Sequence, residues 1–118
     1  MRNVLLLMGV MVSVCLAQDS IPYPPALPTG FFVQWVECVG DYDGDASADV
    51  ASLWQSQSQY YICIYSYKKG SYLLQAPTST SVRTMFSFGD INNDYKIEVI
   101  AGNVIYKYSP SMSKKKVF

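Results

Sequence analysis

Most acidic side chains of this chain lie in two short segments with the same spacing. Seven of its nine Asp and Glu residues fall within 41–49 and 90–98, and the second segment starts 49 residues after the first. Clustered carboxylates repel one another unless a positive charge lies among them. Calcium binds six to eight oxygen ligands, and a tight loop with oxygen side chains on alternate residues can supply them. The spacing therefore predicts a calcium ion in each loop.

The expected calcium ligands occupy the first, third, fifth, seventh and ninth positions of each loop, the seventh through its backbone carbonyl. In the first loop they are Asp41, Asp43, Asp45, Ser47 and Asp49. In the second loop they are Asp90, Asn92, Asp94, Lys96 and Glu98. The alternative is a pair of Asp- and Gly-rich hairpin turns without metal. Repetition of the whole pattern in the same context favours calcium.

Two further features of the loops bear on the type of site. An EF-hand needs an acidic residue at the twelfth loop position and flanking helices. The twelfth positions are Ser52 and Ala101, and the flanks have the pattern of strands. After the third ligand the loops have Ala46 and Tyr95, where a left-handed backbone would favour glycine. We therefore expect strain in both loops, more at Tyr95, and tighter calcium binding in the first loop.

The segments around the loops have the composition of short β-strands. The expected strands are Val33–Val39, Val50–Trp54, Tyr60–Tyr67, Ser71–Gln75, Val82–Phe88, Ile97–Ala101 and Val104–Tyr108. The order strand, acidic loop, strand, connection, strand, turn, strand predicts an antiparallel four-stranded meander, which is the blade of a β-propeller. The predicted fold is all-β, a partial β-propeller with one full and one incomplete blade.

The loops also resemble those of a known family. Gly-Asp-x-Asp-Gly-Asp-x-x-x-Asp-Val from Gly40, and the segment from Phe88 to Gly102, resemble FG-GAP repeats, also called VCBS repeats. These are the calcium-loop blades of integrin α-subunit propellers and of many secreted proteins. The resemblance covers about Val33 to Tyr108. It implies calcium at the residues named above, an extracellular setting, and a role in adhesion or in binding a protein or glycan.

Sequence composition predicts how the rest of the chain is organised. Residues 1–17 have the positive start, apolar stretch and small-residue cleavage site of a secretory signal peptide. Residues 18–30 are a proline-rich linker, 31–108 hold two repeats (31–76 and 82–108), and 109–118 form a polar basic tail. No apolar run outside the signal approaches 18 residues, so no membrane span is predicted. We expect a secreted protein.

Several functions are not expected from this composition. The chain has no histidine, so serine and cysteine lack the usual catalytic base, and we do not expect an enzyme. Its formal net charge is zero and no basic stripe is present, so nucleic acid is not an expected partner. Cys38 and Cys63 are expected to be buried free thiols, with a disulfide as the alternative.

The tyrosines between positions 60 and 72 suggest a surface for interaction. Strand alternation places Tyr61, Cys63, Tyr65 and Tyr67 on one face, and Ile62 and Ile64 on the other. The tyrosine face could stack sugars or a peptide, or pack against the next blade. An uncovered blade face also predicts self-association.

These observations together predict a secreted calcium-binding β-repeat protein. Its calcium would be structural, and its role would be adhesion or the binding of a protein or glycan. The alternatives are a truncated propeller remnant with a structural role only, and an accessory module of a secreted enzyme.

Overall fold

The computed structural model describes residues 21–110, and they form two antiparallel β-sheets. The first sheet has the order β1 (Phe32–Gly40), β2 (Asp49–Ser56), β3 (Gln59–Ser66) and β4 (Ser71–Thr78). A short 3-10 helix, η1 (Arg83–Met85), leads into the second sheet of β5 (Phe86–Gly89), β6 (Glu98–Ala101) and β7 (Val104–Tyr106). The prediction of an all-β chain built from antiparallel meanders is confirmed. The described residues do not form a closed propeller.

The predicted signal peptide and parts of two other predicted segments lie outside the described residues. The signal peptide (1–17), the start of the linker (18–20) and most of the basic tail (111–118) belong to this group. Within residues 21–110, no helix is long and apolar enough to cross a membrane.

Several predicted strand boundaries were wrong, including the end of β7, which stops at Tyr106 and not at Tyr108. β4 continues to Thr78, where we expected a loop, because proline is tolerated on an edge strand and Pro77 pairs with Tyr61 of β3. The predicted strand Val82–Phe88 is η1 followed by the shorter β5. The polar connection between β2 and β3 is only a tight turn, in which Gln57 adopts a positive φ of 56°.

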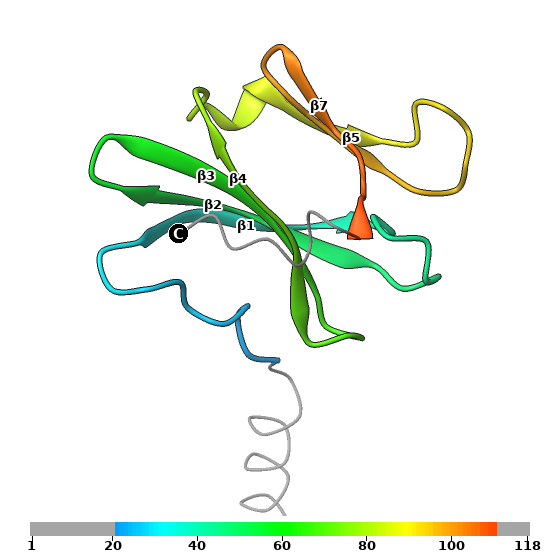
Figure 1. Cartoon of the computed structure of the whole chain (residues 1–118), viewed down its shortest axis with the longest axis horizontal. Helices are drawn as coiled ribbons and strands as arrows, with labels where there is room; N and C mark the ends of the chain where they lie inside the picture. The colour runs from blue at the N-terminus through cyan, green and yellow to red at the C-terminus, as the bar shows by residue number, and fades with distance from the viewer. Residues whose placement is uncertain (1–20, 111–118) are drawn as a thin grey trace, which may run out of the picture.

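The main hydrophobic core lies between the two sheets, which Figure 1 shows one above the other. Ile62 and Ile64 of β3 are fully buried in this core, which also includes Val99 of β6. The Trp35 ring of β1 packs on the edge of Phe86 of β5, with 5.2 Å between the ring centroids. The isoleucine face of the first sheet therefore meets the second sheet, and the tyrosine face does not.

Arg83 of η1 adds a polar contact between the sheets. Its guanidinium lies 5.3 Å from the Trp35 ring centroid and 5.4 Å from that of Phe88, and it forms an ion pair with Glu37 of β1. Cation–π contacts of this kind each contribute about 0.5–1 kcal/mol at partly exposed sites.

The opposite face of the first sheet is covered by residues 21–30, which pass below it in Figure 1. Leu27 packs against Trp54 and Cys63 there, with Tyr61 and Tyr72 beside them. We expected residues 18–30 to be a spacer and the tyrosines to face another blade or a ligand. Residues 21–30, the described part of this linker, instead cover part of that face, where the buried Leu27 packs against Trp54 and Cys63.

The two cysteines that we expected to be buried differ in exposure. Both thiols are free, but only Cys63 is buried, and Cys38 on β1 is exposed. β2 separates β1 from β3 in the sheet, so the two strands that carry the cysteines are not neighbours.

Candidate metal centres

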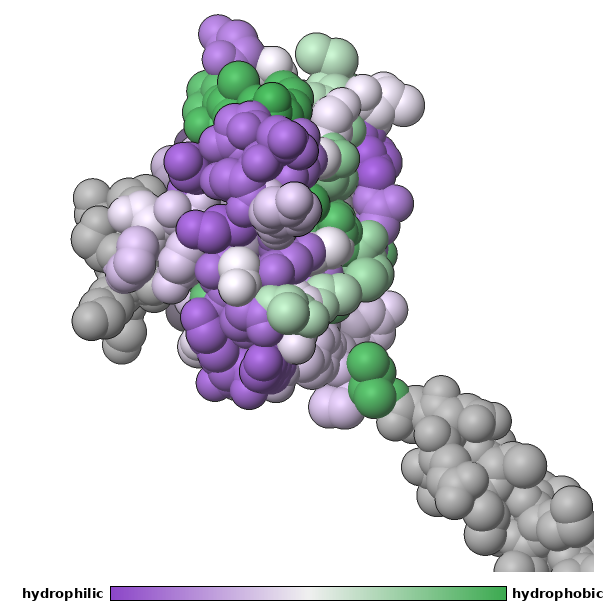
Figure 2. All heavy atoms as spheres, turned by 90° about the vertical axis from the view of Figure 1, so that its right-hand side faces the viewer, coloured by the Kyte–Doolittle hydropathy of each residue, from purple (hydrophilic) through white to green (hydrophobic). Residues whose placement is uncertain are grey.

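The two acidic loops occupy equivalent places in the two sheets and lie side by side. The first joins β1 to β2 and the second joins β5 to β6, and both project to the right in Figure 1. The backbone N–H of Ile97 in the second loop donates to the carbonyl of Asp41 in the first, at 2.8 Å. Figure 2 views the molecule from this side, which is largely hydrophilic.

The first residue of the first loop organises its turn. Asp41 Oδ1 accepts hydrogen bonds from the N–H groups of Gly44 (2.7 Å) and Asp45 (3.2 Å), and its Oδ2 accepts from Ala46 (2.9 Å). Asp45 Oδ1 accepts from the N–H of Ser47 at 2.9 Å. Aspartate favours such local bonds to its own turn. The chain therefore wraps around a carboxylate, which draws the following acidic side chains inward.

The second loop repeats three of these four hydrogen bonds at equivalent positions. Asp90 accepts from the N–H groups of Asp94 (3.0 Å) and Tyr95 (2.8 Å), and Asp94 Oδ1 accepts from Lys96 (3.0 Å). Ala46 and Tyr95 both have a φ of 66°, so the expected left-handed backbone is present at both. A left-handed conformation costs a non-glycine residue about 1–2 kcal/mol. The two loops thus share one conformation, despite different residues at most positions.

Each loop gathers three carboxylates that could hold a metal ion. Oxygens of Asp41, Asp43 and Asp49 all lie within 4.8 Å of one another in the first loop. Oxygens of Asp90, Asp94 and Glu98 do so in the second. These six belong to the ten ligand residues expected from the sequence.

The ninth residue of each loop carries a buried oxygen without a hydrogen-bond partner. Asp49 is fully buried; its Oδ2 accepts from the N–H of Tyr42 at 2.8 Å, and its Oδ1 has no partner. Glu98 is 2% exposed; its Oε1 accepts from the N–H of Ile91 at 3.0 Å, and its Oε2 has no partner. A buried charged oxygen without a partner is costly. A cation among the three carboxylates would provide the missing contact in both loops.

Electrostatics differ between the two loops. Burial, together with the charges of Asp43, Asp45 and Asp41, raises the pKa of Asp49 to about 6, although the bond from Tyr42 N–H opposes this rise. The hydrogen bond from the N–H of Lys96 is the main cause that lowers the pKa of Asp94. The buried Asp49 carboxylate is therefore disfavoured in its ionised form, whereas the half-buried Asp94 carboxylate is stabilised in its ionised form.

Two lysines of the β3–β4 turn reach the first loop, and we did not foresee this. Lys69 Nζ lies 2.5 Å from Asp43 Oδ2, and Lys68 Nζ donates to the carbonyl of Asp45 at 3.0 Å. In a four-stranded meander the first and third connections lie at the same end of the sheet. That rule, applied to Lys68 and Lys69, could have predicted the contact from the sequence. In the second loop Lys107 lies 3.9 Å from Asp94, at the outer limit of an ion pair.

The other four expected ligand residues lie outside the two carboxylate clusters and make different contacts. Asp45 is outside the three-carboxylate cluster, although its Oδ2 is buried without a partner. The Asn92 side chain hydrogen-bonds to Asp94. Ser47 and Lys96, expected to contribute carbonyls, donate their N–H groups to the loop carboxylates.

The Lys96 side chain also crosses to the neighbouring loop. It lies over Gly44, where an added Cβ would come within 2.8 Å of Lys96 Cε. Gly44 has a φ of 81°, so the backbone conformation favours glycine at this position, whereas the flexible Lys96 side chain could move aside for a Cβ.

Comparisons of the chain with models of known protein families, with curated proteins and with solved structures gave no match. The resemblance to FG-GAP repeats therefore rests on the loop residues and their strand context.

Proposed function

We propose that this chain is a secreted calcium-binding β-repeat protein in which calcium braces the fold and the fold binds a protein or glycan. The observation that carries the calcium proposal is the buried, unpartnered oxygen at the ninth position of both loops, Asp49 Oδ1 and Glu98 Oε2. Both residues belong to a cluster of three carboxylates.

The chemistry of the donors favours calcium among the common metals. Both clusters consist of carboxylates, with no histidine anywhere in the chain. Zinc prefers nitrogen and sulfur ligands, whereas calcium prefers oxygen. Magnesium requires near-octahedral geometry and keeps several waters, so it fits a flexible loop of side-chain oxygens less well. We therefore assign calcium to the six carboxylates, at an affinity of about 10⁻⁴–10⁻³ M, as in extracellular modules.

A bound cation would stabilise the fold by joining the two ends of each loop. Asp41 follows β1 and Asp49 begins β2, so one ion shared between them fixes the first strand pair. Asp90 and Glu98 hold the same places between β5 and β6. Because the loops contact each other through Ile97 and Asp41, this bracing also supports the packing of the two sheets.

The binding role rests on the resemblance to FG-GAP repeats, which implies an extracellular adhesive or ligand-binding function. The expected signal peptide agrees with that setting. The loops themselves offer no catalytic arrangement, since their carboxylates are committed to turn hydrogen bonds and to the ion.

Terbium binding tests the metal proposal. Terbium replaces calcium at oxygen sites and emits when a nearby tyrosine is excited, and Tyr42 and Tyr95 lie within the two loops. We expect saturable emission that calcium displaces. Asp49→Asn should remove the first-loop component and Glu98→Gln the second. Glu37→Gln, at an exposed carboxylate outside the loops, should change neither. Emission that survives the Asp49→Asn, Glu98→Gln double variant would refute the assignment.

A further inference from the structure

Residues 21–28 have the composition of an extended polyproline helix. Prolines at 22, 24, 25 and 28 fix their own φ near −65° and exclude the residues before them from the α conformation. A polyproline helix has three residues per turn and no internal hydrogen bonds, so its carbonyls are free to accept from a partner. Segments of this kind are recognised by aromatic-lined grooves.

The first sheet contacts this segment in that manner. The Tyr67 hydroxyl donates to the carbonyl of Pro22 at 2.6 Å, and the Tyr72 hydroxyl donates to that of Pro25 at 2.6 Å. The two accepting residues are three apart, which is one turn of a polyproline helix, so both carbonyls face the same side. Tyr67, in the turn directly after β3, and Tyr72 of β4 thus match the period of the segment.

An apolar anchor completes the contact. Leu27 is 8% exposed and packs against Trp54 and Cys63, while Pro24 is buried. We call the surface formed by Trp54, Tyr61, Tyr67 and Tyr72 the aromatic groove. Its ligand pattern is a carbonyl, a second carbonyl three residues later, and a branched apolar side chain two residues after that.

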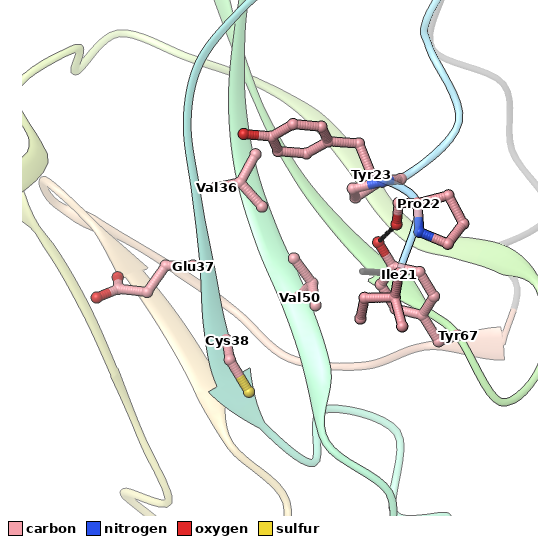
Figure 3. Close-up of a pocket in the computed structure, with 9 residues that line it drawn as sticks. Ile21, Pro22, Tyr23, Val36, Glu37, Cys38, Val50 and Tyr67 are labelled. Carbon is pink, nitrogen blue, oxygen red and sulfur yellow. Dashed lines mark hydrogen bonds between the residues drawn. The ribbon is translucent and has the colours of Figure 1, made fainter. Parts of the chain in front are cut away.

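The segment does not fill the space beside the groove. A hollow of about 240 Å³ remains between residues 21–24 and β1 and β2, bounded by Val36, Val50 and Tyr67 (Figure 3). A second hollow of about 170 Å³ lies near Tyr23, Val33 and Trp54. Ile21 and Tyr23 of the segment are themselves 77% and 76% exposed. The segment is therefore an incomplete fit for the surface that it covers.

We propose that the aromatic groove binds an extended proline-rich segment of another polypeptide, and that residues 21–28 occupy it in this chain as a tethered competitor. This inference names a partner for the binding role proposed above and rests on that role, but it does not require calcium. The occupant is argued from the chain's own segment, which has this chemistry and already bonds to the groove through two tyrosines.

A separate polypeptide is a better occupant than the segment of a second copy. Phe31 N–H donates to the carbonyl of Pro28 at 3.2 Å, and Gly30 has a φ of 98°, so a turn directs the segment back over its own sheet. An exchange between copies would have to open this turn. A partner in trans has only to displace the segment, whose tether gives it an effective concentration of about millimolar.

The test uses the full chain and a fluorescent peptide with the sequence of residues 21–28. Leu27→Asp places a charge in the apolar part of the groove and weakens the tethered competitor, so fluorescence anisotropy should show the peptide binding this variant at least about tenfold more tightly than the unchanged chain. Leu27→Ala is a milder variant, and it should also bind the peptide more tightly than the unchanged chain does. Adding Tyr72→Phe should weaken peptide binding about 2- to 10-fold, because one receptor hydroxyl is lost. A peptide with Asp in place of its Leu is the matched control and should not bind.

Three outcomes would overturn the proposal. The first is a folded Leu27→Ala chain that does not bind the peptide, and the second is peptide binding that Tyr72→Phe leaves unchanged. The third is that the unchanged chain forms a dimer, that Leu27→Asp abolishes this dimer, and that added peptide does not affect it. This result would assign the groove to a second copy of the chain. Each titration is repeated with calcium and with EDTA. Peptide binding without terbium emission would refute only the metal proposal, and emission without peptide binding would refute only the groove.

Discussion

Replacing Asp49 by asparagine should stabilise the metal-free protein and remove one calcium site. Asn can still accept the hydrogen bond from Tyr42 N–H through its amide oxygen. Its NH₂ group would take the place of the unpartnered Oδ1, in a residue that lies in a cluster of three carboxylates. The substitution therefore exchanges a repelled anion for a donor of similar shape.

The raised pKa of Asp49 sets the size and the pH range of the effect. Because the folded value of about 6 exceeds the ordinary value of 3.8, the folded state retains this proton to a higher pH than the unfolded state. Stability without metal should then fall as pH rises from about 4 to about 6, and the full cost should be present above pH 6. A tenfold change in proton affinity is worth about 1.4 kcal/mol, so this cost is up to about 3 kcal/mol.

Urea denaturation in EDTA measures this effect directly. At pH 7.5, Asp49→Asn should raise the free energy of unfolding by up to about 3 kcal/mol, and at pH 4 the two chains should be equal. Calcium at 5 mM should add about 1–2 kcal/mol per site to the free energy of unfolding if its dissociation constant is about 10⁻⁴–10⁻³ M. The Asp49→Asn variant should lack the contribution of the first site.

Asp94→Asn in the second loop is the matched control, with the opposite sign. Its carboxylate has a lowered pKa, chiefly because of the Lys96 N–H, so neutralising it should destabilise the metal-free chain. If Asp49→Asn instead destabilises the EDTA form at pH 7.5, the assignment of Asp49 as a buried and poorly compensated anion is refuted.

Three further predictions concern other residues. Ala46→Gly and Tyr95→Gly should each raise the free energy of unfolding, measured in urea, by about 0.5–1 kcal/mol. Glycine relieves the positive φ, although it gains entropy in the unfolded state. A lower free energy of unfolding in both variants would contradict backbone strain at these positions. Lys69→Met should raise terbium affinity in the first loop, because the ammonium now paired with an acidic ligand competes with the metal; unchanged affinity would exclude that competition. A thiol reagent should modify Cys38 in the folded chain and Cys63 only after denaturation, because burial of Cys63 also raises its pKa; equal rates in the folded chain would contradict its burial.

The sequence was sufficient to predict the local structure of both acidic loops. Aspartate at the first position bonds to the N–H groups that follow it, so the loop conformation depends on residues close in sequence. Strand alternation was equally local, and it correctly separated Ile62 and Ile64 from Tyr61 and Cys63. The all-β fold and most strands followed from these patterns.

Contacts between distant segments depend on how the strands and sheets are arranged, and local patterns alone did not predict them. Lys69 reaches Asp43 because two connections of the first sheet lie at one end, and Ile97 reaches Asp41 because the sheets pack face to face. The proline-rich segment was expected to be a spacer, since proline content predicts extension but not what an extended segment contacts. The exposure of Cys38 likewise depends on the place of its strand, β1, at the edge of the first sheet.

The sequence by itself determined the two loops and the alternation of the strands, because both depend on interactions within a few residues. Only the tertiary structure decided which face of the first sheet meets the second sheet and which meets residues 21–30. The reason is that an apolar face can be buried by any complementary surface, and the choice among them depends on the packing of the whole chain.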